Sequence, residues 1–487
     1  MQDLTVPLQW LKRVGFGRGN PFSENNAEQD ESLLYVFVKF PYFDEILGNP
    51  KRPTSTFLVA PRGGGKSANR RMLEQGIQED TRVPVLVVPY LDAALVGQAN
   101  AGTSGRISVL THVERICQHA TLALLAWLQE HPERVVALTP ESYGALFKWH
   151  LNQIRGFCTP LGLDRWLKSA NLYTPKLNGS ALFRAAEGAQ KIPQPFNPNV
   201  QPLIELVGEL LSPKTPLLDL QPLNAFELLE RFVELSQEFG IKTVYILVDR
   251  VDEAETAAFS PQMAAQQLMP LATDLLLLEM PHVAFKFFVP TTVAVELRRL
   301  VRMDRVRFYE VEWTDEKLLE LFNGRVQYFS QARRASFDEL MEQGSDAVTQ
   351  LIKSAEKSPR RLLRTGEWLL YERYARNPAT KGYISKKDVE AAIRRTHKEY
   401  SLTSSASVEE GDTEKKVESD QTKEQSQVGV REQISRRGIH LDARGSIWRD
   451  GKKLDQPLSA NEFRLFEILY EHAGKRVSIE NLIAGYT

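Results

Sequence analysis

The sequence predicts an α/β fold in which helices cover a parallel sheet, and three patterns lead to this prediction. A β-type run over residues 55–59 passes through a glycine-rich turn into a helical pattern, and a second β-type run begins at Val83. A strand, a helix and a strand at this spacing form a βαβ unit, whose two strands run parallel. Two further apolar runs, which end at Asp249 and Thr292, are expected to extend the same sheet.

Composition argues against several other classes of protein. At roughly 150 residues per domain, the 487 residues suggest two to four folded units. Lys and Arg number 61 against 62 Asp and Glu, so the net charge gives no sign of a nucleic-acid-binding protein. Cys117 and Cys158 form no CxxC pair, which argues against a disulfide framework or a cysteine zinc site. Because the sequence has no signal pattern and no long apolar stretch, we expect a soluble cytoplasmic protein without a membrane segment.

Changes in pattern along the chain divide it into five regions. Residues 1–50 mix apolar clusters with Asn, Pro and Gly, and they are expected to pack as a strap on the next domain. A sheet domain spans 51–300 with a helical insertion at about 107–240, and a helical lid domain follows over 301–400. Residues 401–437 carry no aromatic side chain, which predicts a flexible linker, and 438–487 form a separate module.

Residues 60–67 carry the motif with the clearest chemistry. They read APRGGGKS and match the P-loop pattern GxxxxGK[ST] except at Ala60, which turns the strand. Glycines let successive backbone N–H groups surround a β-phosphate, Lys66 would reach the β- and γ-phosphates, and Ser67 Oγ would bind Mg²⁺. The residues expected to contact ATP in this loop are Ala60, Arg62, Gly63, Gly64, Gly65, Lys66 and Ser67.

A P-loop site also needs an acidic residue at the end of a neighbouring strand. The run YILVD ends at Asp249, which we expect to hold Mg²⁺ together with Ser67. Glu253 follows in the same loop and is the candidate for polarising an attacking water, with Asp252 as the alternate. Lys66 completes the predicted catalytic set.

The set PRGGGKS, ILVDRVDE and a third strand ending in Thr291 and Thr292 resembles the additional-strand P-loop ATPases, which include AAA+, origin-recognition and STAND (signal-transduction ATPase) proteins. The resemblance implies that Thr291 or Thr292 senses the γ-phosphate and that Arg360 and Arg361 act as a second sensor from the lid. AAA+ enzymes commonly have Glu directly after the metal-binding Asp, whereas this sequence has Arg250. Slow hydrolysis is therefore expected.

A cluster of arginines follows the third strand. Two interpretations stay open: an arginine finger that reaches across a subunit interface, or a solvated helix face. The residues are Arg298, Arg299, Arg302, Arg305 and Arg307.

The C-terminal module begins with β-type pieces and continues into a helix. Ser459 and Glu462 form a capping box ahead of an amphipathic pattern. Together, GIHLD, SIWRDGKKL and LSANEFRLFEILYEHAGKRVS resemble the OmpR/PhoB-type winged-helix output domain. That family is about twice as long, and its recognition helix would come after Thr487. We therefore expect either a fragment of a DNA-binding protein or a half-domain that binds other proteins.

The fold class expected for the whole chain is α/β: a P-loop NTPase parallel sheet with a helical insertion and a helical lid, plus a partial winged-helix module. The leading functional hypothesis is a signal-transduction ATPase in which ATP and Mg²⁺ control a DNA-binding or transcription-regulatory output, with nucleotide-dependent homo-oligomers as a further expectation. The alternatives are a motor-like AAA+ ATPase of DNA processing, and a transcription regulator whose ATPase is degenerate.

Overall fold

The computed structural model describes most of the first 408 residues and four short strands beyond them. The described ranges are 5–79, 83–91, 107–136, 223–253, 260–342, 346–378 and 383–408, and strand residues between 435 and 453. The chain divides into two units, residues 1–407 and 408–487.

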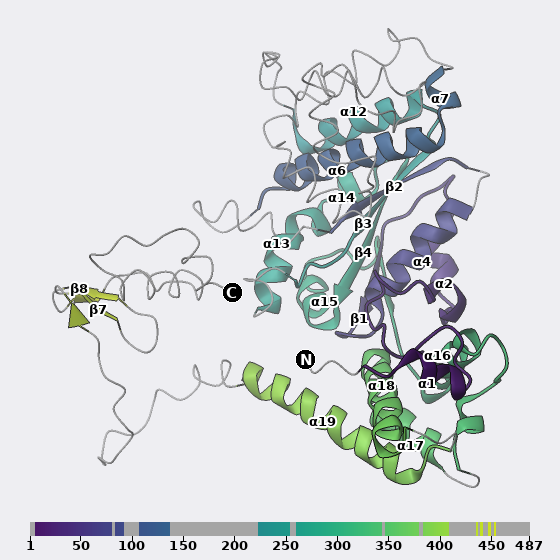
Figure 1. The fold of residues 1–487 in the computed structure, drawn as a ribbon. Coiled ribbons are helices and arrows are strands. Elements are labelled where there is room, and N and C mark those ends of the chain that lie inside the picture. The colour runs from purple at the N-terminus through teal and green to yellow at the C-terminus, as the bar shows by residue number, and fades with distance from the viewer. Residues whose placement is uncertain are drawn as a thin grey trace, which may run out of the picture. The chain divides into compact units, whose positions relative to one another are not determined.

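A parallel sheet forms the centre of the first unit, with β4 as its middle strand (Figure 1). Its described strands lie in the order β2-β3-β4-β1-β5, and every neighbouring pair is parallel. The strands are β1 (Thr56–Ala60), β2 (Val85–Tyr90), β3 (Thr243–Val248), β4 (Val283–Pro290) and β5 (Arg307–Glu310). Four of them are almost wholly buried, as expected where helices cover both faces of a parallel sheet. The predicted α/β architecture is confirmed.

Two boundaries differ from the sequence-based expectation. The apolar run expected to reach Thr292 leaves the sheet at Pro290, because Thr291 and Thr292 are the first residues of a helix. The sheet also continues past residue 300, since β5 pairs with β1 after the expected start of the lid domain. β5 is short and partly exposed, so its pattern RFYE lacks the apolar run of the other strands.

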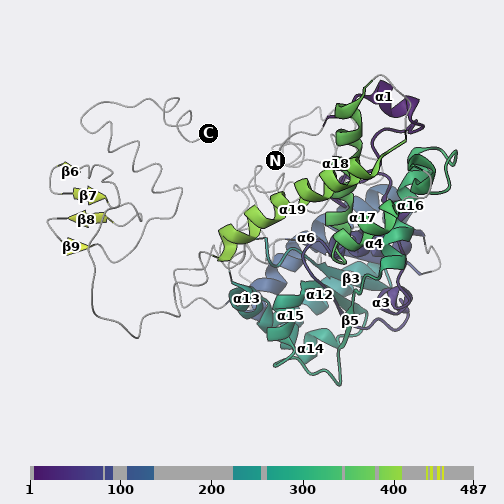
Figure 2. The same ribbon diagram turned by 90° about the horizontal axis from the view of Figure 1, so that it is seen from below.

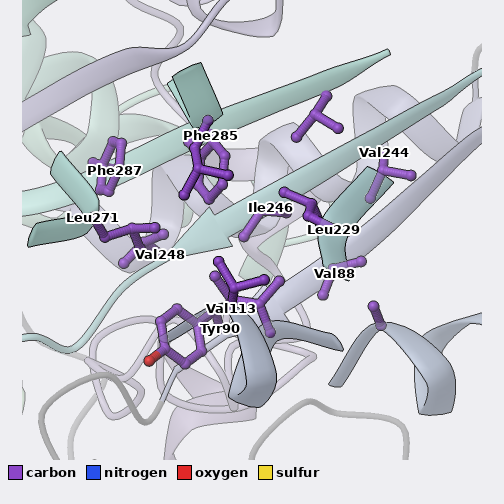
Figure 3. Close-up of a cluster of buried hydrophobic side chains, with 14 of the residues drawn as sticks. Val88, Tyr90, Val113, Leu229, Val244, Ile246, Val248, Leu271, Phe285 and Phe287 are labelled. Carbon is purple, nitrogen blue, oxygen red and sulfur yellow. The ribbon is translucent and has the colours of Figure 1, made fainter. Parts of the chain in front are cut away.

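One face of the sheet is covered by helices that flank or follow β2, β3 and β4. Figure 3 shows Val113, Leu229 and Leu271 from three of these helices against strand residues such as Ile246 and Phe285. The helices on this side are α6 (Val109–Glu130), α12 (Ala225–Glu238), α13 (Pro261–Thr273), α14 (Leu275–Leu278) and α15 (Thr291–Leu297), and α7 (Glu133–Val136) follows α6. The ends of the predicted insertion thus form part of the helical layer, while its middle, 137–222, lies outside the described residues.

The other face is covered by α4 (Lys66–Glu79) and the N-terminal segment. That segment contains α1 (Leu8–Arg13), α2 (Leu33–Val36) and α3 (Phe43–Leu47). Its buried side chains form one core cluster with α4 and with the helices that follow β5. The predicted strap therefore packs on the sheet domain and on the helical region together.

The helical region follows β5, and Figure 2 shows its helices α16, α17, α18 and α19 from below. Its described elements are α16 (Asp315–Phe329), the 3-10 turn η2 (Phe337–Leu340), α17 (Ala347–Ser354), α18 (Pro359–Arg376) and α19 (Lys386–Val408). Thr314 and Ser358 cap α16 and α18 by accepting from backbone N–H groups of the first turn. Helix α19 runs eight residues into the linker expected from 401, because extending a formed helix costs far less than starting one.

A buried arginine ties the N-terminal segment to α16. Arg325 Nη1 donates to Asp30 Oδ2 at 2.6 Å, and its other nitrogens donate to the carbonyls of Pro21 (2.6 Å) and Glu24 (2.7 Å). Nearby, Phe22 stacks on Phe322 with ring centroids 4.5 Å apart. The stretch that follows, residues 24–38, is thereby held against the helical region.

The second unit contains a four-stranded antiparallel sheet among its described residues. The strands are β6 (Ser435–Arg436), β7 (Ile439–Leu441), β8 (Ile447–Arg449) and β9 (Lys452–Lys453), paired in that order. β7 and β8 fall on the predicted pieces GIHLD and SIWRDG, whereas β6 falls in the expected linker. The capped helix predicted at 459–474 lies outside the described residues, so the winged-helix identity stays a prediction.

Every helix in the described part of the chain is too short or too polar to cross a bilayer.

Candidate functional site

A glycine-rich loop, residues 61–65, connects β1 to α4 at the carboxyl edge of the sheet. Gly63 and Gly65 have φ of +73° and +92°, a region that residues with a side chain rarely adopt. Helix α4 begins directly after the loop, at Lys66. Three consecutive glycines, Gly63 to Gly65, therefore give the loop the tight backbone that a phosphate cradle requires.

The start of α18 and the residue Trp313 lie directly against this loop. A Cβ added at Gly63 would lie 3.0 Å from Arg360 Cβ, so only glycine allows α18 this close. Trp313 Nε1 donates to the carbonyl of Gly64 at 3.0 Å. The loop thus contacts the helical region at two consecutive residues.

A cavity of about 610 Å³ lies where the loop, the end of β3, the N-terminal segment and α18 meet. The predicted site residues that line it are Arg62, Gly63, Gly65, Lys66, Ser67, Asp249, Asp252, Glu253 and Arg360. These side chains come from widely separated parts of the sequence, and the fold brings them to one place. Apolar residues also line the cavity: Leu33, Val36, Phe37, Val38, Trp313, Leu321 and Leu363.

The other predicted site residues do not line the cavity. Ala60 is buried at the end of β1, and Gly64 bonds to Trp313 through its carbonyl. Thr291 and Thr292 are exposed at the start of α15. The Arg361 side chain has other partners: it donates to His397 Nδ1 at 2.7 Å and forms an ion pair with Glu356.

The strand that carries Asp249 is not the neighbour of β1, contrary to the sequence-based expectation. β4 lies between β1 and β3 and pairs with both. The expectation failed because the chain order of strands does not reveal their spatial order. Asp249 nevertheless lines the same cavity as Lys66 and Ser67, with only 1% of its surface exposed.

Two arginines that the sequence analysis did not assign to the site hold the Asp249 carboxylate. Arg70 Nε donates to Oδ2 at 3.2 Å, and the backbone N–H of Arg250 donates to Oδ1 at 2.8 Å. Both guanidinium groups also donate to the carboxylate of Glu28, and Arg70 pairs in addition with Glu74. We call these five residues the carboxylate–arginine network.

The sequence carries a signal for one member of this network. Arg70, Leu73 and Ile77 have the i, i+3, i+7 spacing of the buried stripe of α4, so a charge stands where an apolar residue is expected. Arg70 is wholly buried. Glu28 carries no comparable signal, because it lies in an irregular segment whose placement depends on tertiary contacts.

Burial lowers the pKa of Lys66, and the guanidinium groups of Arg360 and Arg62 add to this effect, while Asp252 and Asp249 oppose it. An anion placed in the cavity would favour the charged ammonium again. The electrostatic setting of Lys66 therefore suits a negatively charged ligand.

Both predicted water-activating carboxylates are paired with arginines. Arg62 Nε donates to Asp252 Oδ2 at 3.2 Å, and Arg250 Nε lies 3.7 Å from Glu253 Oε2. The Glu253 side chain is 62% exposed. Burial of part of its surface raises the pKa of Glu253, with Asp249 and Asp252 acting in the same direction and Arg250 and Lys66 against it.

Each arginine of the cluster after β4 forms an ion pair with a carboxylate of the same chain, as is common on solvated protein surfaces. Arg305 forms a two-pronged pair with Glu279 at 2.7 and 2.8 Å. The other pairs are Arg298–Glu310, Arg299–Glu296, Arg302–Asp304 and Arg307–Glu45. Of the two interpretations, this pattern favours the solvated face.

The residues of the site could supply part of the coordination shell of a magnesium ion, with the remaining ligands coming from a bound nucleotide and water. The described residues contain no group of three or more potential His, Cys, Asp or Glu ligands. Ser67 and Asp249 line one cavity and offer a hydroxyl and a carboxylate, which are oxygen donors that Mg²⁺ accepts. Phosphate oxygens and water would complete the shell, as is usual for Mg²⁺ bound with a nucleotide.

No protein-family model matches the chain, and no curated protein matches it.

Proposed function

We propose that the chain binds ATP with Mg²⁺ in this cavity and acts as a nucleotide-dependent switch with slow hydrolysis. The observation that carries the proposal is the convergence of Lys66, Ser67, Asp249 and Arg360 on one cavity from α4, the end of β3 and the start of α18. The apolar lining residues support the same proposal, because a nucleoside triphosphate carries a flat, largely apolar base as well as charged phosphates.

Each polar residue has a distinct role in this proposal. The backbone N–H groups of the loop and the Lys66 ammonium bind the phosphates, and Ser67 and Asp249 hold the metal, Asp249 through water. Bound Mg²⁺ offsets phosphate charge. Glu253 orients and polarises a water, and Arg360 contacts the γ-phosphate from α18.

The strand order supports the resemblance to the additional-strand ATPases. That division is named for a strand between the one that leads into the phosphate loop and the one that ends in the metal-binding carboxylate. β4 lies in this place between β1 and β3.

The proposed switch depends on the contacts between the glycine-rich loop and the helical region. Arg360 and Trp313 belong to the helical region and contact consecutive loop residues, so a γ-phosphate that binds Arg360 would hold α18 against the loop. Moving such an equilibrium from 1:99 to 99:1 takes about 5.5 kcal/mol of differential affinity, which several charge-assisted hydrogen bonds can supply. The C-terminal module would then act as the output, on DNA or on another subunit.

ATP with Mg²⁺ is expected to raise the melting temperature of the wild type, and Lys66→Ala is expected to abolish this shift. At one hundred times the dissociation constant the ligand stabilises the folded state by about 2.7 kcal/mol. The control is Lys242→Ala, at the opposite, amino end of β3, which should keep the full shift. A wild-type melting temperature that does not change on adding ATP with Mg²⁺, or an equal shift in Lys66→Ala, would contradict the proposal.

A motor-like ATPase is the second candidate, and hydrolysis separates it from the switch. Because Arg250 and Arg62 occupy the candidate water-activating carboxylates, we expect slow turnover and retention of nucleotide through gel filtration. Steady-state phosphate release measures the rate. Rapid turnover that collapses in Glu253→Gln would favour the motor instead.

A further inference from the structure

The N-terminal segment contributes a charged residue to the cavity, and its contacts are specific. Glu28 lines the cavity, and its carboxylate accepts from both arginines that hold Asp249, Arg70 and Arg250. Its side chain is 11% exposed, so these ion pairs are shielded from bulk water. No residue between 1 and 50 was expected at the site from the sequence.

The geometry gives Glu28 control over how strongly the arginines hold Asp249. Arg70 divides its donors among Glu28, Glu74 and Asp249, and its contact with Asp249 is a hydrogen bond of 3.2 Å. If Glu28 became neutral, Arg70 would retain only Glu74 and Asp249 as charged partners. The site would also lose one negative charge near the metal-binding carboxylate. Both effects weaken the attraction of Asp249 for a cation.

We propose that Glu28 is a positioning residue for the metal site: by sharing Arg70 and holding Arg250, it leaves Asp249 available to Mg²⁺ only when the N-terminal segment is docked. The inference rests on the proposed function. It assigns to residues 24–30 a regulatory role, because undocking this segment would remove Glu28 and raise the Mg²⁺ concentration that the site requires. Asp30 and Arg325 keep the segment docked through their buried ion pair at 2.6 Å.

The conformation of Arg250 agrees with this role. Its φ of +59° is left-handed, which costs a residue with a side chain about 1–2 kcal/mol. This conformation points the Arg250 N–H at Asp249 while its guanidinium reaches Glu28 at 2.9 Å. Glu28 therefore accepts from the Arg250 guanidinium, whereas Asp249 accepts from the Arg250 backbone N–H.

The test titrates Mg²⁺ against a fluorescent ATP analogue, which reports binding without hydrolysis. Glu28→Gln is expected to need about five- to tenfold more Mg²⁺ for half-maximal binding, while binding of the analogue in EDTA stays equal or tightens. Glu28→Asp keeps the charge and should retain much of the wild-type Mg²⁺ dependence. The matched control is Glu24→Gln, on the same segment and cavity wall, whose carboxylate accepts from the backbone N–H of Asn26.

A second variant keeps the test decisive if Glu28→Gln does not fold. In Arg250→Met, Glu28 would pair with Arg70 without competition from Arg250, and one positive charge near Asp249 would be removed. Both changes should lower the Mg²⁺ concentration needed for half-maximal binding. Unchanged Mg²⁺ dependence in both variants, or an equal loss of binding with and without Mg²⁺, would overturn the inference while leaving ATP binding intact. Failure of the wild type to bind the analogue at any Mg²⁺ concentration would instead overturn the proposed function and, with it, this inference.

Discussion

Replacing Arg70 with methionine is expected to lower the free energy of unfolding by about 3–5 kcal/mol. The guanidinium is wholly buried and pairs with three carboxylates, whose side chains are 1% (Asp249), 11% (Glu28) and 18% (Glu74) exposed. Burial by itself would lower the pKa of Arg70, but these carboxylates raise it above its ordinary value. Removing the cation would leave three negative charges together with little solvent to screen them. Urea unfolding measures the loss.

The neighbouring arginine provides the control for this prediction. Arg71 donates to the carbonyls of Ala27 at 2.9 Å and Glu28 at 2.6 Å, so Arg71→Met removes hydrogen bonds without leaving a buried carboxylate unpaired. Its expected cost is about 1–3 kcal/mol. The double variant Arg70→Met with Glu74→Gln should recover part of the loss, because it removes one of the repelling charges. Equal destabilisation by Arg70→Met and Arg71→Met would show that the carboxylate–arginine network stabilises the fold no more than ordinary hydrogen bonds do.

Replacing Lys286 with methionine is expected to stabilise the protein at pH 7 and to remove a pH dependence of its stability. Lys286 lies in the middle of β4 with no exposed surface, and its Nζ donates to the carbonyl of Thr54 at 2.8 Å. The Nζ also lies 5.1 Å from the centre of the Tyr245 ring. Burial lowers the pKa of Lys286 to about 7 from an ordinary value of 10.5.

The sign of the pH dependence follows from proton binding. Between pH 7 and 10.5 the unfolded chain holds a proton on Lys286 that the folded chain releases, so stability rises with pH across this window. Below it both states are protonated and the folded state bears the full cost, on the order of 5 kcal/mol. Methionine avoids this cost, but it leaves the Thr54 carbonyl without its hydrogen-bond donor. The loss of that bond reduces the gain in stability by about 1 kcal/mol.

Urea unfolding of both proteins between pH 7 and 9.5 checks this prediction. The slope of stability against pH should be smaller in Lys286→Met than in the wild type, and the two curves should converge as pH rises. Lys242→Met, at an exposed lysine just before β3, should leave the wild-type slope unchanged. Parallel curves for Lys286→Met and the wild type would contradict the assignment of the titration to Lys286.

The central elements of the fold were predictable because their signals are local. Continuous apolar runs place β1, β2, β3 and β4, and the glycine-rich loop with the helix after it follows from residues 61–79 alone. Loop backbone, Lys66 and Ser67 are consecutive, so their proximity needs no tertiary information. Strand β5 and the end of β4 were not predictable in the same way, since RFYE is short and partly exposed and Thr291 suits a strand or a helix start.

The sequence by itself determined an α/β sheet, a glycine-rich loop between a strand and a helix, and the acidic residue at the end of the Asp249 run, because each is encoded within a few neighbouring residues. Only the tertiary structure decided that β4 separates β1 from β3, that Arg360 and Trp313 touch the loop, and that Glu28 shares Arg70 with Asp249. The physical reason is the separation of the interacting residues in the sequence. Neighbouring strands and buried ion pairs join residues up to some hundreds of positions apart, and local propensities do not determine which charged residues will pair.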